Sequence, residues 1–128
     1  MKRKIISIEE APKAIGPYSQ GIAVSKQKET FYFSGQLGID PATGKIEGDV
    51  AAQTVQTIKN IDALLKANDM TADNVIKTLV FITDMSDFAA VNTEYTKYFS
   101  VNPPARSCVA VKQLPLSGLV EIEIIAMK

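Results

Sequence analysis

The sequence contains no histidine among its 128 residues. Histidine is the base in Ser-His-Asp and Cys-His catalysis and a common zinc ligand, so these chemistries and histidine-pair ribonuclease chemistry are excluded. Proton transfer near neutral pH must therefore use Asp, Glu, Tyr, Lys, the single cysteine or water. Metal-ligand clusters and Gly-rich phosphate loops are also missing, so we predict neither a metal nor another cofactor.

The single cysteine, Cys108, excludes an internal disulfide and is typical of a reducing compartment. No apolar run is long enough to cross a bilayer, and Ile5–Ile8 is too short for the core of a signal peptide. The 14 basic and 14 acidic residues give a formal net charge of zero, and only Met1–Lys4 forms a basic cluster. We therefore expect a cytoplasmic protein with no membrane or nucleic-acid partner.

The order of apolar patterns predicts an α+β fold. Strands are expected over residues 4–8, 20–25, 30–34, 75–83 and 104–115 and from Val120 onward, with the polar turn Lys26–Glu29 joining the second strand to the third. Helices are expected from Asp49 to about Ala67 and from Ser86 or Asp87 to about Phe99. This order predicts a single domain over residues 1–128, with two layers, a mixed β-sheet and both helices on one face. The other face of the sheet then needs a cover, which self-association would supply.

Periodicity predicts which side of each helix is buried. In the first helix the expected buried stripe consists of Ala51, Val55, Ile58, Ile61 and Leu65, and Asn68 is expected to end the helix in the left-handed conformation. In the second helix the expected buried face consists of Phe88, Val91, Tyr95 and Tyr98 or Phe99.

The last two predicted strands carry charged residues within apolar runs. Side chains alternate between the faces of a strand, so Arg106 shares a face with Cys108, and Glu121 shares a face with Glu123. We expect the opposite, apolar faces to pack on the core, which would place Arg106 beside a carboxylate. Arg106 can bind a substrate carboxylate through two charge-assisted hydrogen bonds or form a structural ion pair with Glu121 or Glu123.

Four separated motifs carry a resemblance to a known family. They are Gly16–Gln20, Phe33–Gln36, Asp84–Phe88 followed by Asn92, and Pro104–Ile122. In this order they closely resemble the reactive-intermediate deaminase family (RidA, formerly YjgF/UK114), and the resemblance covers essentially the whole chain. It implies a chorismate-mutase-like fold and a homotrimer whose sheets face a central barrel, with ligand sites between subunits.

The resemblance also implies which residues form the site. Arg106 would anchor the substrate carboxylate, and Glu121 would hold and activate a water, since a carboxylate in a partly desolvated cleft can exchange a proton near neutral pH. Cys108 would contribute mainly its backbone, because no histidine activates its sulfur and only Arg106 offers positive charge nearby. The full set of substrate-binding residues that the resemblance implies is Tyr18, Ser34, Gly35, Asn92, Arg106, Ser107 and Cys108.

The activity that the resemblance implies is hydrolysis of 2-iminopropanoate or 2-iminobutanoate to a 2-oxo acid and ammonia, the imines arising from enamines that dehydratases release. One alternative is a non-enzymatic binder of small 2-oxo or amino acids, which would use the same Arg106. Another is an RNA-cleaving translation inhibitor, an activity ascribed to some relatives and disfavoured by the zero net charge and the absence of histidine. Glu121 favours an enzyme over a binder.

Overall fold

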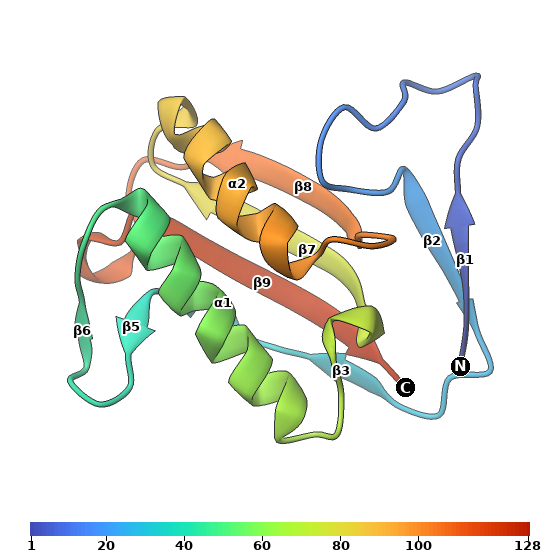
Figure 1. Ribbon diagram of the computed structural model, residues 1–128, viewed down its shortest axis with the longest axis horizontal. Helices are drawn as coiled ribbons and strands as arrows, with labels where there is room; N and C mark the ends of the chain where they lie inside the picture. The colour runs from blue at the N-terminus through green and yellow to red at the C-terminus, as the bar shows by residue number, and fades with distance from the viewer.

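Two helices cover one face of a central sheet in the computed structural model, which describes residues 1–128. The helices α1 (Val50–Lys66) and α2 (Phe88–Tyr98) lie side by side in front of the sheet in Figure 1. The strands are β1 (Lys2–Ile6), β2 (Gly21–Ser25), β3 (Thr30–Tyr32), β4 (Gln36–Leu37), β5 (Ile39–Asp40), β6 (Lys45–Ile46), β7 (Val75–Ile82), β8 (Ala105–Ala110) and β9 (Val120–Met127). Short 3-10 turns occupy Ala72–Asn74, Met85–Asp87 and Pro115–Ser117. The predicted two-layer α+β arrangement is confirmed.

The strand β7 lies inside the main sheet, as its nearly continuous apolar sequence predicts. The strand order is β3-β9-β7-β8, and β4 also pairs with β9. The sheet is mixed, because β8 runs parallel to β7 whereas β9 is antiparallel to it. The crossover through α2 returns the chain to one side of β7, which leaves the other side to β9. Consequently β7 separates β8 from β9, and the expectation that Arg106 and a glutamate lie beside each other is wrong.

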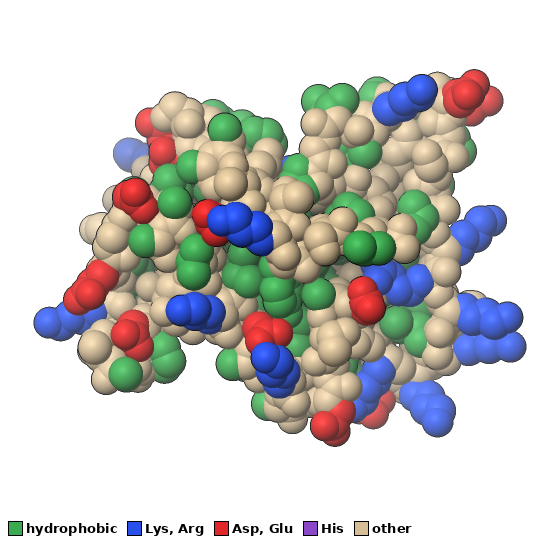
Figure 2. Space-filling view, viewed as in Figure 1, with side chains coloured by type: hydrophobic (Ala, Val, Ile, Leu, Met, Phe, Trp, Pro, Cys, Tyr) green, Lys and Arg blue, Asp and Glu red, His purple; other side chains and the backbone are tan.

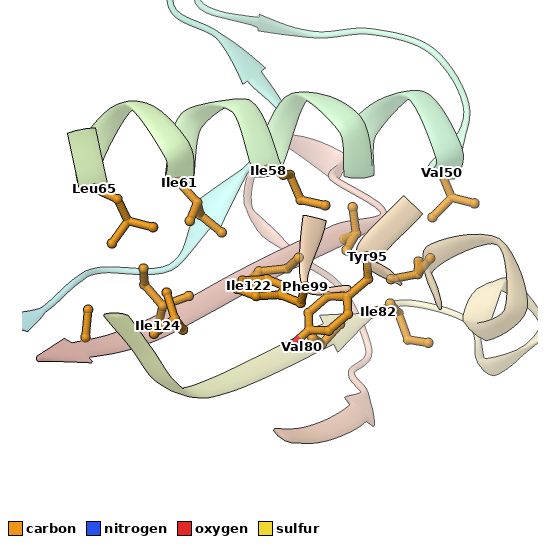
Figure 3. Close-up of a cluster of buried hydrophobic side chains, with 14 of the residues drawn as sticks. Val50, Ile58, Ile61, Leu65, Val80, Ile82, Tyr95, Phe99, Ile122 and Ile124 are labelled. Carbon is orange, nitrogen blue, oxygen red and sulfur yellow. The ribbon is translucent and has the colours of Figure 1, made fainter. Parts of the chain in front are cut away.

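The core lies between α1, α2 and the inner face of the sheet (Figure 3). The α1 side chains Val50, Ile58, Ile61 and Leu65 face β7 and β9, and Tyr95 and Phe99 of α2 complete the layer. The predicted α1 stripe is partly wrong, because Val55 is 37% exposed. Polar residues replace it on the buried side. Thr54 donates a hydrogen bond to the Val50 carbonyl, and Gln53 donates to the Gly48 carbonyl and accepts from the Leu119 amide. Such internally satisfied polar groups can be buried.

The ends of the helices agree only partly with the prediction. Asp49 caps α1 by accepting a hydrogen bond from the Ala52 amide at 2.9 Å. The left-handed residue after α1 is Asp69, at φ 55°, whereas Asn68 donates its side-chain amide to the Leu64 carbonyl. Before α2, Asp84 caps the 3-10 turn by accepting from the Ser86 amide. Asp87 occupies the predicted N-cap position of α2, although its side chain forms no capping hydrogen bond. Asp69 takes the left-handed conformation predicted for Asn68, and Ser86 caps neither the 3-10 turn nor α2.

The strands β1 and β2 form a separate antiparallel ribbon beside the main sheet (Figure 1). The turn after Ser25 does not close a hairpin, because β3 pairs with β9 instead of β2. Two residues, Ser19 and Arg3, attach the ribbon. Ser19 bridges to Ala105 at the start of β8, and Arg3 donates hydrogen bonds to the carbonyls of Asp73 and Asn102. Basic side chains gather along this end of the molecule in Figure 2.

The face of the sheet away from the helices has no cover within the chain. Paired residues point to the same side, so Glu121 shares this face with Phe81 and Val109. Tyr32, on the same face through its pairing with Ile125, is 78% exposed, and Val109 is 48% exposed. Large apolar and charged side chains thus alternate on an open surface.

Tyr95 supplies the polar link between α2 and the sheet. Its hydroxyl forms a 2.8 Å hydrogen bond with the Thr78 hydroxyl, and both side chains are fully buried. Burial raises the pKa of Tyr95 to about 12. The neutral hydroxyl therefore contributes to stability below the pKa of an unfolded tyrosine, about 10, and this contribution is lost as the pH rises through about 12.

We predict that the free energy of unfolding of the protein falls between pH 10 and pH 12, and that Tyr95→Phe makes this fall shallower, because the variant lacks the buried group that must ionise. Urea unfolding at a series of pH values measures both. Burial also raises the pKa of Tyr98, so part of the slope persists. A slope in Tyr95→Phe identical to that of the wild-type protein would contradict the assignment.

Candidate active site

Arg106 lies on β8, at the edge of the main sheet, and its side chain points toward α2. Its register partner on β7 is Thr78, which is fully buried under the helices, so Arg106 faces the same side. The guanidinium carbon lies 4.9 Å from the ring centroid of Tyr95, 5.5 Å from that of Phe88 and 5.8 Å from that of Tyr18. Three aromatic rings thus surround the cation at distances typical of cation–π contacts.

Asn92 and the loop before β2 complete the surroundings of Arg106. The Nη1 group of Arg106 donates a 2.7 Å hydrogen bond to Oδ1 of Asn92, which projects from α2. A Cβ atom on Gly16 would lie 3.6 Å from Nη2 of Arg106, so the loop backbone passes close to the cation. The Tyr18 hydroxyl accepts a hydrogen bond from the Ile15 amide at 3.3 Å. Of the predicted residues, Tyr18, Asn92 and Cys108 are therefore brought together with Arg106.

The charge of Arg106 has no acidic partner in the chain. The two salt bridges present are Lys66–Asp62 and Lys97–Glu94, both on the helices. The alternative of a structural ion pair between Arg106 and Glu121 or Glu123 is therefore wrong. A cation held by aromatic rings and one amide oxygen keeps its capacity to bind an external anion.

Cys108 and Ser107 point to opposite sides of β8. Cys108 packs against the core, and burial raises the pKa of its thiol more than the nearby Arg106 lowers it. A thiol of this kind is a poor nucleophile near neutral pH, which agrees with the expectation of a backbone role. Ser107 is exposed on the open face of the sheet, where its hydroxyl is 3.5 Å from Nζ of Lys77.

Glu121 forms a second group of predicted residues, with Gly35. It lies on β9, where its side chain passes directly over Gly35. A Cβ atom on Gly35 would overlap the Glu121 carboxylate, with Cδ at 2.9 Å. Only glycine at position 35 leaves the carboxylate in this place. Ser34 is exposed beside it, and its carbonyl accepts a hydrogen bond from the Gln36 side chain.

The two groups lie on opposite faces of the sheet. Arg106 pairs with Thr78 and Glu121 pairs with Phe81, and these two residues of β7 point in opposite directions because they are three apart. Two strand spacings, about 10 Å, also separate β8 from β9. Four surface cavities are present, and none is lined by Arg106 or Glu121. One copy of the chain therefore cannot bring both side chains to the same small molecule.

The rings of Tyr18, Phe88 and Tyr95 form an aromatic box around Arg106, and sequence reasoning missed this box. The sequence pattern predicts Phe88 and Tyr95 as core residues of the second helix only, although they flank Asn92 at spacings of four and three residues. This periodicity places all three on one helix face. The sequence signal for the box is therefore Asn92, which matches a position of the family, together with Phe88 and Tyr95 on the same helix face.

The described residues contain no group of three or more acidic or cysteine side chains arranged to hold a metal ion. No helix has both the length and the apolar character needed to span a membrane.

Comparison with known proteins shows the family of the chain. Residues 8–128 match the protein family described as endoribonuclease L-PSP. The chain is 47% identical to the 2-iminobutanoate/2-iminopropanoate deaminase of Bos taurus, over 98% of this chain and 90% of the bovine protein. The chain belongs to this family, the YjgF/RidA family.

Two solved structures of the RidA fold agree over the whole chain. RidA from an Antarctic Psychrobacter is 40% identical, with a TM-score of 0.76 and coverage of 98% of this chain and 99% of that chain. TdcF of E. coli, solved with bound serine, is 41% identical, with a TM-score of 0.75 and 98% coverage of both chains. The names within the family range from deaminase to endoribonuclease.

We predict that Asn92→Asp weakens the binding of pyruvate at least about tenfold, because a carboxylate at position 92 would pair with Arg106 and compete with the anion. Titration calorimetry measures the affinity. Thr93→Asp adds the same charge at an exposed neighbouring position and is the matched control. Equal affinities in the two variants would show that Arg106 does not bind the anion.

Proposed function

We propose that this protein hydrolyses small 2-imino acids, such as 2-iminopropanoate and 2-iminobutanoate, to 2-oxo acids and ammonia. The observation that carries the proposal is Arg106, a half-buried cation without an acidic partner in an aromatic box. The 47% identity with a bovine deaminase of that specificity supports it. The chemistry needs only one anchored carboxylate, one water and one acid/base group.

Arg106 is the carboxylate clamp in this proposal. Asn92 occupies Nη1, which orients the guanidinium, and the remaining N–H groups are directed to the substrate. The backbone of Ser107 and Cys108 and the Tyr18 side chain form the walls beside it. An arginine binds a carboxylate with directional charge-assisted hydrogen bonds, so the clamp fixes the position of the imine carbon as well as the charge.

Glu121 of a second copy completes the site. Within one chain the sheet separates Glu121 from Arg106, whereas the open sheet face that carries Glu121 exposes Tyr32 and Val109. Burying that face between copies removes apolar surface from water. We propose a homotrimer whose sheets enclose a central barrel, with each ligand site between two subunits, near Arg106 of one and Ser34, Gly35 and Glu121 of the next.

The proposed reaction has two steps, addition of water to the imine and loss of ammonia. Glu121 accepts a proton from a water as the water oxygen bonds to the imine carbon, and the imine nitrogen takes up a proton from solvent to become an amine. Glu121 then gives its proton to that amine and the C–N bond breaks. Ammonia leaves as the hydroxyl loses its proton to solvent and becomes the carbonyl of the 2-oxo acid. Imines hydrolyse spontaneously in water, so orientation together with one acid/base group, worth about 10²–10⁴-fold, is sufficient acceleration.

A second candidate function is binding of small amino or 2-oxo acids without turnover. The serine-bound structure of the related TdcF favours it, because Arg106 would bind the carboxylate of either ligand class. The two functions differ in their need for Glu121. A binder requires only the clamp, whereas the hydrolase requires a carboxylate at position 121.

We predict that Arg106→Ala lowers kcat/KM roughly 100-fold by removing the clamp, and that Glu121→Gln lowers kcat about 10²–10⁴-fold while 2-oxobutanoate still binds. The assay measures release of pyruvate and 2-oxobutanoate from imines that a dehydratase generates, with semicarbazide as the competing trap. Glu123→Gln, two residues along the same strand face, is the matched control. A wild-type protein that binds 2-oxobutanoate but does not accelerate its release would establish the binder instead.

We also predict that chains carrying Arg106→Ala and chains carrying Glu121→Gln restore activity when refolded together. In a random equimolar mixture about one quarter of intersubunit sites would combine an intact Arg106 with an intact Glu121. Each variant refolded alone is the control. Sites contained within one chain would recover no activity, and that result would overturn the intersubunit arrangement.

A further inference from the structure

The loop over residues 7–18 passes across Arg106 with little regular structure to hold it. It contains one backbone–backbone hydrogen bond, from the Tyr18 amide to the Gly16 carbonyl. Most of its residues are exposed, and Ile15 is 93% exposed. A loop of this kind needs side-chain contacts to keep a defined position.

The side chain of Gln20 provides most of these contacts. Its Oε1 atom accepts a 2.7 Å hydrogen bond from the Ile8 amide. Its Nε2 atom donates to the carbonyls of Ile8 at 3.1 Å and Pro12 at 2.8 Å, with a longer contact of 3.4 Å to that of Ala11. One glutamine thus connects the first half of the loop to the residues that follow it.

The other end of the loop is attached to β8. Ser19 bridges to Ala105, and its amide donates to the Pro104 carbonyl. Gln20 follows directly, so the same short segment is joined to the strand of Arg106 and to the start of the loop. The tip between these two attachments brings Gly16 and Tyr18 to the guanidinium of Arg106.

We propose that Gln20 is a positioning residue that closes the loop over residues 7–18, so that Gly16 and Tyr18 form a fixed wall of the anion site at Arg106. The identity of the anion rests on the proposed function, whereas the closure of the loop does not. A primary amide is required because the Ile8 peptide presents both a donor and an acceptor. Glutamate has nearly the same shape but offers no donor, and its charge would face carbonyl oxygens.

The test compares Gln20→Glu with Gln27→Glu, which adds the same charge in the exposed turn after β2. Trypsin cleavage after Lys13, within the loop, is followed by mass spectrometry of the fragment that begins at Ala14. We expect Gln20→Glu to be cleaved about tenfold faster than wild type, because the opened loop reaches the protease. Thermal unfolding of both variants identifies any global destabilisation.

Kinetics with dehydratase-generated imines give the second readout. A displaced wall weakens ground-state and transition-state binding alike, so Gln20→Glu is expected to raise KM about tenfold with kcat within about twofold of wild type. A variant that merely folded less well would lose kcat through a smaller active fraction. Gln27→Glu is expected to match wild type in both parameters.

If trypsin cleaves Gln20→Glu after Lys13 at the wild-type rate, the proposal is overturned. Faster cleavage with an unchanged KM would also overturn it. If the wild-type protein itself hydrolyses no imine, the proposed function fails. Cleavage after Lys13 then decides the loop closure separately, together with pyruvate affinity measured by calorimetry. Faster cleavage with weaker pyruvate binding supports it, and any other combination overturns it.

Discussion

The alternation of side chains across β7 is the constraint on which the rest of the site depends. Thr78 and Phe81 point to opposite sides of that strand. Their pairing partners, Arg106 on β8 and Glu121 on β9, therefore also point to opposite faces of the sheet. No rotamer of either side chain can cross a packed sheet. The proposed carboxylate clamp, Arg106, and the proposed acid/base group, Glu121, therefore belong to different surfaces of one chain. The proposed reaction would require two copies, and the exposed apolar side chains beside Glu121 offer a physical reason for copies to associate.

The second feature is a cation surrounded by neutral groups. The faces of three aromatic rings and one amide oxygen stabilise the guanidinium of Arg106 without neutralising it. A carboxylate in place of Asn92 would have produced a satisfied structural ion pair. The aromatic box also removes water from one side of the cation, which strengthens its interaction with an incoming anion. In the proposed function, anion binding would depend on the charge of Arg106, which the chain leaves without an acidic partner.

The loop that carries Gly16 and Tyr18 joins the surroundings of Arg106 to the β1–β2 ribbon. Ser19 ties it to β8, and Gln20 ties its beginning to its end. The motif Gly16–Gln20 thereby gains a physical explanation: close backbone approach at Gly16, an aromatic wall at Tyr18 and two attachments at Ser19 and Gln20. Gly35 plays a comparable part on the other face, where the absence of a side chain leaves space for Glu121.

The sequence by itself determined the elements and the chemistry available to them. Apolar periodicity located both helices, the residue type at Asp49 predicted the cap of the first, and a nearly continuous apolar run predicted the inner strand β7. The absence of histidine favoured a carboxylate as the acid/base group, and the family resemblance selected Glu121. The sequence also placed Arg106 and Cys108 on one strand face, because alternation is a local property. Strand order is not local, so only the tertiary structure decided that β7 separates β8 from β9, that Phe88 and Tyr95 surround Arg106 and that β2 and β3 belong to different sheets. Local patterns record which side of an element is apolar, whereas the neighbour that covers each side depends on how the chain crosses over in three dimensions.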